Sequence, residues 1–124
     1  MVYKHLQDVT AFLAGDATHI REVLHPDKEA VDINYSLAFA TLEPGMASLP
    51  HVIRESVEVY IITEGHGTAF VGGEERVLLP GVVLAIPAGV EQFVRNEGSG
   101  PLRFWCIVSP PWRAENESVS PVEE

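Results

Sequence analysis

The side chains best suited to chemistry lie in two glycine-bounded stretches in the middle of the chain. Residues 45–65 contain His51 and Glu58, and residues 81–96 contain Gln92. An imidazole and a carboxylate are metal ligands, and an amide offers a carbonyl oxygen that is a weaker ligand. If the imidazole and the carboxylate share one buried pocket, they can also exchange protons without a metal. The residue types therefore indicate either a metal site or a polar pocket.

The spacing within these stretches resembles the paired motifs of the cupin superfamily. The first family motif reads G-x5-H-x-H-x(3,4)-E-x6-G, and the second reads G-x5-P-x-G-x2-H-x3-N. The chain matches them at Gly45, His51, Glu58, Gly65, Gly81, Pro87, Gly89 and Asn96. Ile53 stands where the family has its second histidine, and Gln92 stands where it has its last. The resemblance implies a small single-domain cupin of the conserved-barrel type, an all-β double-stranded β-helix or jelly-roll barrel, with a degenerate metal site.

In the family pattern, the motif side chains point into the barrel around a metal ion. The resemblance therefore implies that His51, Glu58 and Gln92 form a set of three donors for a divalent metal. Ile53 has no donor atom and an amide replaces an imidazole, so we expect such a metal to be held weakly or not at all. Glu55 has the strand parity of His51 and would add an oxygen ligand for a harder cation if it points inward. The other interpretation places Glu55 in a solvated loop.

A second interpretation of the same residues needs no metal. The buried polar groups would satisfy one another's hydrogen bonds and line an amphipathic pocket, with His51, Ile53, Glu58 and Gln92 as ligand-binding residues. This predicts a protein that binds a small molecule inside the barrel, with or without a weakly held divalent metal. The alternative is a metal-dependent enzyme of the dioxygenase or isomerase type, because the resemblance implies a site and does not fix a reaction.

Short apolar segments bounded by Gly, Pro or Asn predict the strands that would position these residues. We expect strands at residues 18–24, 36–42, 58–63, 68–71, 76–79, 82–86 and 102–109. For residues 18–24 a short helix is the alternative. Turns after residue 63 and at Gly72-Gly73 predict two consecutive hairpins. The apolar runs at 82–86 and 102–109 are typical of central strands.

Composition and charge limit the class of protein. The chain has 124 residues, enough for one domain, with the motif-bearing barrel at about residues 36–109 and an acidic, solvated tail at 113–124. Eighteen acidic and 8 basic residues give a net charge of −10, which disfavours nucleic acid as a partner. No apolar run approaches the ~20 residues of a membrane helix, so we expect no membrane contact. The lone Cys106 and the lack of a signal-peptide pattern predict a cytoplasmic location.

Residues 36–42 predict how the protein associates. Leu37 and Phe39 would lie on one face of this strand, whereas Ala38, Ala40 and Leu42 would lie on the other. Both faces are mostly apolar, but only one of them can face the barrel interior. We therefore expect a second copy of the chain to cover the other face, which makes the protein a homodimer.

Overall fold

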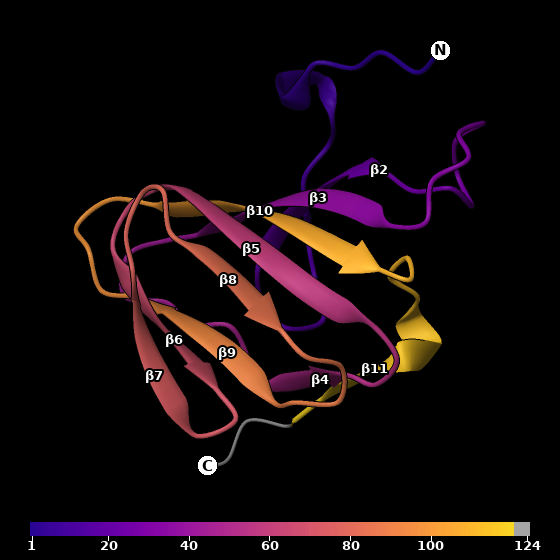
Figure 1. Cartoon of the computed structure of the whole chain (residues 1–124). Helices are drawn as coiled ribbons and strands as arrows, with labels where there is room; N and C mark the ends of the chain where they lie inside the picture. The colour runs from indigo at the N-terminus through magenta and orange to yellow at the C-terminus, as the bar shows by residue number, and fades with distance from the viewer. Residues whose placement is uncertain (121–124) are drawn as a thin grey trace.

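The computed structural model describes residues 1–120, and its regular secondary structure is almost entirely antiparallel strand (Figure 1). The chain forms β1 (Phe12–Leu13), β2 (His19–Leu24), β3 (Ser36–Leu42), β4 (His51–Ile53), β5 (Val57–Glu64), β6 (Gly67–Val71), β7 (Glu74–Leu78), β8 (Val83–Ile86), β9 (Gln92–Asn96), β10 (Leu102–Ser109) and β11 (Glu117–Val119). Two short 3-10 helices are η1 (Leu6–Asp8) and η2 (Ala114–Asn116). One sheet has the order β1-β2-β3-β10-β5-β8, and the other has the order β11-β4-β9-β6-β7. The prediction of an all-β jelly-roll barrel is confirmed.

The core lies between the two sheets, because each strand sends alternate side chains inward. Along β10, Leu102, Phe104, Cys106 and Val108 are buried, while the residues between them are more exposed. The ring of Phe104 packs against the ring of Tyr60 on β5, with centroids 4.7 Å apart. In the six-stranded sheet β10 lies between β3 and β5, which confirms the prediction that residues 102–109 form a central strand.

All seven segments predicted as strands contain a strand, but their pairing differs in one place. The hairpin at Gly72-Gly73 is confirmed, since β6 pairs with β7 and both glycines have positive φ, 56° and 84°. The hairpin expected between residues 58–63 and 68–71 is wrong, because β5 and β6 belong to different sheets. Gly65 lies at this crossing with φ 97°, and a Cβ there would sit 2.5 Å from the carbonyl oxygen of Pro101. Only glycine fits so close to another segment's backbone.

The expectation that residues 82–86 form a central strand is also wrong. β8 pairs with β5 alone and lies at the edge of the six-stranded sheet. Its outward side chains, such as Val83, remain exposed. An uninterrupted apolar run signals burial on both faces only when another layer covers the second face, and the described residues supply no such layer over β8.

The outer surface of the six-stranded sheet is apolar over four strands. Side chains in register form one row from β3 to β8 through Phe39, Trp105, Ile61 and Val83, and a second row through Leu37, Ile107 and Val59. We refer to these seven side chains as the outer apolar face. Phe39 and Trp105 pack edge to face with centroids 4.8 Å apart. Residues 36–42 thus carry apolar side chains on both faces because one face of β3 packs in the core and the other belongs to the outer apolar face.

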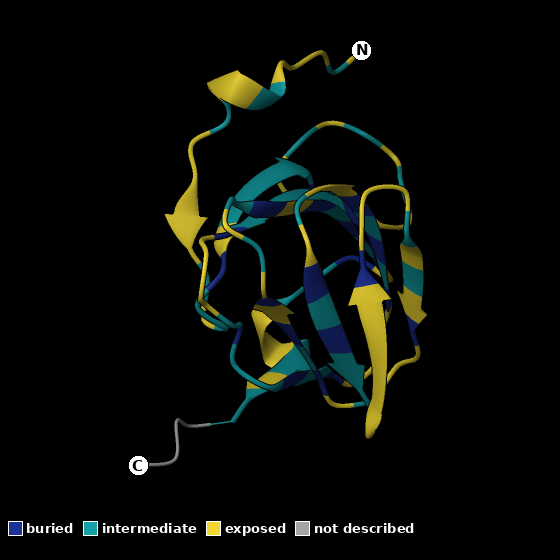
Figure 2. Ribbon diagram, turned by 90° about the vertical axis from the view of Figure 1, so that its left-hand side faces the viewer, coloured by how far each residue is buried: buried dark blue, intermediate teal, exposed yellow. Residues whose placement is uncertain are grey.

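The first residues of the chain form an arm outside the barrel (Figures 1 and 2). The Lys4 ammonium donates to the carbonyl oxygen of Val23 at 2.7 Å, which ties the arm to β2. β1 then pairs with the start of β2 and leads into the loop before it. Within residues 1–120, no helix is long and apolar enough to cross a membrane.

Candidate functional site

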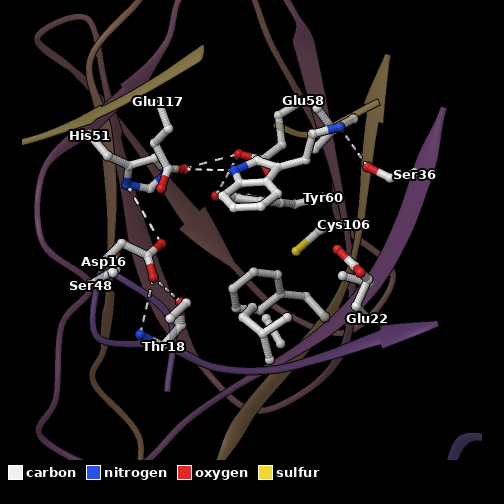
Figure 3. A pocket seen from close by; sticks show the side chains of 18 of the residues that line it. Asp16, Thr18, Glu22, Ser36, Ser48, His51, Glu58, Tyr60, Cys106 and Glu117 are labelled. Atoms are coloured by element: carbon white, nitrogen blue, oxygen red, sulfur yellow. Dashed lines mark hydrogen bonds and ion pairs between the residues drawn. The ribbon is translucent and has the colours of Figure 1, made fainter. Parts of the chain in front are cut away.

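A cavity lies between the two sheets and receives side chains from both of them (Figure 3). Its volume, measured as the space open to the centre of a water molecule, is about 120 Å³. One water needs roughly 10–15 Å³ on this measure, so the cavity has room for several waters or for a small organic molecule. Its wall combines apolar side chains with a cluster of titratable groups around His51.

His51 is the centre of this cluster and is 2% exposed. Its Nδ1–H donates to the carbonyl oxygen of Leu49 at 2.9 Å, with the Asp16 carboxylate 3.7 Å from the same nitrogen. Its Nε2 lies 3.9 Å from Oε1 of Glu58, an ion-pair distance beyond hydrogen-bond range. Burial alone would lower the pKa of His51, but the carboxylates of Glu58 and Asp16 and the carbonyl of Leu49 outweigh it and raise the pKa to about 9. The ring is therefore an imidazolium at neutral pH.

Glu58, Tyr60 and Gln92 form a buried hydrogen-bonded group beside His51. The Gln92 amide donates to Oε1 of Glu58 at 2.9 Å. The Tyr60 hydroxyl lies 2.7 Å from Oε1 of Gln92 and 3.1 Å from Oε1 of Glu58, and its single proton serves one of these acceptors at a time. Burial and the charge of Glu58 raise the pKa of Tyr60 well above its ordinary value, so the hydroxyl stays neutral. This group fixes the position of the Glu58 carboxylate.

Strand register brings these residues together. His51 on β4 stands opposite Gln92 on β9, so both side chains point to the same side of the five-stranded sheet. Glu58 and Tyr60 are two residues apart on β5, and both point inward from the facing sheet.

Asp16 reaches the site from the loop before β2, a part of the chain in which the sequence indicates no functional residue. Its Oδ1 accepts from the amide of Thr18 at 3.1 Å, and Ala17 between them takes a left-handed conformation with φ 72°. The carbonyl of Asp16 also accepts from the amide of Leu49 at 2.6 Å, and Leu49 is the residue whose carbonyl accepts from His51. The Asp-Ala-Thr sequence is a signal for such a turn, but nothing in it shows that the turn faces His51.

Glu117 is a second residue that sequence reasoning missed. We expected the acidic residues after 113 to be solvated, yet β11 pairs with the open edge of β4 and sets Glu117 opposite Ile53, with its side chain in the cavity wall. Its Oε2 accepts from Nε1 of Trp112 at 3.2 Å. Burial raises the pKa of Glu117 despite this hydrogen bond, which acts in the opposite direction. The predicted tail residues Glu123 and Glu124 lie outside the described residues.

The predicted ligand-binding residues occupy different positions around the cavity. His51 and Glu58 line it, whereas Gln92 is fully buried and holds Glu58 by a hydrogen bond. Ile53 is buried on β4 and is not among the lining residues. Glu55 lies exposed in the bend after β4, so it adds no oxygen ligand to the set.

These residues do not fit a resident transition metal. Within residues 1–120, no three His, Cys, Asp or Glu side chains are arranged to hold a metal ion. His51 would have to lose its proton before it could ligate. The ligating oxygen of Gln92 already accepts from Tyr60, and Ile53 offers no donor.

Comparisons with known proteins agree with this architecture. The sequence matches the family described as "Cupin domain" over residues 38–108. It is 30% identical over 111 residues to an uncharacterized protein of Methanocaldococcus jannaschii, covering 90% of this chain and 88% of that one.

Solved structures show the same fold at lower identity. A predicted oxalate decarboxylase from Thermotoga maritima superposes with a TM-score of 0.78 at 20% identity, over 89% of this chain and 99% of that one. Ectoine synthase from P. lautus superposes with a TM-score of 0.74 at 20% identity, over 100% of this chain and 94% of that one. A variant of the Streptomyces protein Pac13, solved with uridine, superposes with a TM-score of 0.78 at 13% identity, over 98% of this chain and 92% of that one.

Proposed function

Because this chain belongs to the cupin domain family, we propose that it binds a small molecule inside its barrel, with His51 and Glu58 as the central polar contacts. One observation carries this proposal. Within residues 1–120, neither Nε2 of His51 nor Oε2 of Glu58 has a hydrogen-bond partner, although both side chains are more than nine-tenths buried and line the cavity. No fully buried side-chain nitrogen or oxygen within these residues lacks a hydrogen-bond partner, so these two atoms are open to the cavity, where a ligand would pair them.

The solved relatives give independent support for a small-molecule site. Their names refer to a predicted oxalate decarboxylase and an ectoine synthase, and one of them contains uridine. These are enzymes or binders of small molecules, built on the same barrel. Their identities to this chain are too low to carry over a substrate or a reaction.

Filling the cavity tests the proposed function. Ala38 projects from β3 into the cavity, so Ala38→Leu should abolish binding of a low-molecular-weight fragment library observed by ligand-detected NMR, while the thermal unfolding midpoint stays the same or rises. Ala85→Leu, on the exposed side of β8, is the matched control and should bind the same fragments as the wild type. A library without hits, or hits that Ala38→Leu retains, would contradict the proposal.

We further propose that any divalent metal at His51, Glu58 and Gln92 is held only weakly. Protein purified without a histidine tag should contain well below one metal ion per chain by elemental mass spectrometry, because the set lacks two of the imidazoles that the family motifs supply. Stoichiometric iron, manganese, nickel or zinc that is lost in His51→Ala would contradict this. It would support the metal-dependent enzyme of the dioxygenase or isomerase type instead.

We propose that a second copy of the chain covers the outer apolar face. An isologous contact requires a self-complementary surface, and this face has both signs of charge at one end, with Arg21 and Arg103 beside Glu43 and Glu64. Sedimentation equilibrium at micromolar concentration should therefore show a dimer, and Ile61→Glu should dissociate it with the β-sheet circular dichroism unchanged. Val77→Glu, on exposed β7 of the other sheet, should remain dimeric. A monomeric wild type would overturn the dimer and leave the barrel site intact.

We also propose a cytoplasmic location, which the single cysteine supports. Cys106 is buried in the cavity wall, and burial raises the pKa of its thiol well above the ordinary value. A reduced, unreactive thiol of this kind is typical of proteins in reducing compartments.

A further inference from the structure

The cavity wall is strongly acidic. Its titratable carboxyl groups belong to Asp16, Glu22, Glu58 and Glu117, and its one basic side chain is His51. No lysine or arginine of the described chain lines the cavity. Glu22 forms an ion pair with Lys28 at the surface. Three carboxyl groups therefore stand against one histidine in this wall.

Each of these three carboxyl groups has an oxygen that is free to accept a further hydrogen bond. Oδ1 of Asp16 accepts from Thr18, Oε1 of Glu58 accepts from Gln92, and Oε2 of Glu117 accepts from Trp112. No hydrogen bond within residues 1–120 uses the other oxygen of any of the three. Figure 3 shows that they approach the same part of the cavity as His51, from a loop, from β5 and from β11.

Most of the rest of the wall is apolar, and its neutral polar members include Thr18, Ser36, Ser48 and Tyr60. Ile20, Ala38, Val94, Phe104 and Val108 line it from strands of both sheets. A ligand that matches this cavity needs a hydrocarbon body for these side chains and a donor-rich group for the carboxyl oxygens.

We propose that the ligand of the barrel is a small organic cation, an amine or amidine with an apolar body, whose nitrogen donates to the free oxygens of Glu58, Asp16 and Glu117. This inference rests on the proposed function and specifies its ligand. Among the described residues of the cavity wall, an anionic ligand would find one basic side chain, His51, and the carboxylates of Glu58 and Asp16 already lie within 4 Å of that ring. Burying a further negative charge beside three carboxyl groups costs free energy, whereas a cation neutralises them.

Matched probes that differ only in charge test this inference. Benzylamine, benzyl alcohol and benzoate share one apolar body, and so do butylamine, butanol and butyrate. Titration calorimetry at pH 7 should show each amine binding at least about 10-fold more tightly than its alcohol, because a hydrogen bond to a charged group contributes roughly 1.5–3 kcal/mol. The two carboxylates should show no binding.

Glu117 provides the matched variants. Glu117→Gln should weaken amine binding several-fold and leave alcohol binding unchanged, and Glu115→Gln, an exposed neighbour on η2, should change neither. If an alcohol or a carboxylate binds as tightly as its amine and Ala38→Leu abolishes that binding, the proposal of a cationic ligand is wrong and the proposal of a small-molecule site stands. If none of the six probes and no library fragment binds inside the barrel, both proposals are wrong.

Discussion

Replacing Glu58 by glutamine is expected to lower the pKa of His51 from about 9 toward its ordinary value of 6.5 and to destabilise the fold. The glutamine keeps the shape of the side chain but removes one of the two negative charges within 4 Å of the buried ring. Breaking a buried ion pair typically costs about 3–5 kcal/mol when a charge is left without its partner. His51 can release its proton instead, so we expect a smaller loss of about 2 kcal/mol at pH 7.

Two measurements check this prediction together. The pKa follows from the ring resonances of His51 in an NMR titration, and the free energy of unfolding follows from urea denaturation. Glu55→Gln, three residues earlier in an exposed bend, should leave both unchanged and serves as the control. An unaltered His51 pKa in Glu58→Gln would mean that this carboxylate does not hold the proton on the ring.

The stability of the wild type is expected to fall as the pH rises from 6.5 to about 9. In this window the folded state keeps a proton on His51 that the unfolded state has released, so each further rise in pH favours unfolding. The loss over the whole window should be about 3 kcal/mol. The raised pKa of Cys106 adds to the loss mainly above 9.0, where most of the thiol of the unfolded chain is ionised.

Variants at two histidines isolate the contribution of His51. His51→Gln should flatten the dependence of the unfolding free energy on pH between 6.5 and 9, measured by urea denaturation at several pH values. His66→Gln, in the exposed turn between β5 and β6, should retain the wild-type slope. A wild type whose stability is constant across this window would show that the ring is neutral in the folded state.

The sequence predicts part of this site because strand geometry links sequence spacing to direction. His51, Glu58 and Gln92 lie at fixed distances from turn-forming glycines, so their place inside a barrel follows once the strands are recognised. The prediction fails for β8, since an apolar run does not reveal whether a strand lies at an edge. It also fails at Gly65, where a turn-like sequence carries the chain from one sheet to the other.

The residues that give the cavity its charge are harder to predict. Asp16 enters through a loop whose position depends on a backbone hydrogen bond to Leu49, more than thirty positions away. Glu117 enters because the last described strand pairs with β4, although its sequence is polar and resembles a solvated tail. Both placements arise from long-range backbone pairing, which no local pattern of residue types encodes. The acidic character of the site therefore becomes visible only in three dimensions.

We propose that a small molecule binds inside the barrel against His51 and Glu58. Intermolecular nuclear Overhauser effects from bound benzylamine to assigned side chains test it most directly. We predict contacts to the inward-facing Ala38 and Val94. Contacts confined to Leu6 and Phe39, in the groove between the N-terminal arm and the outer side of the six-stranded sheet, would contradict the claim.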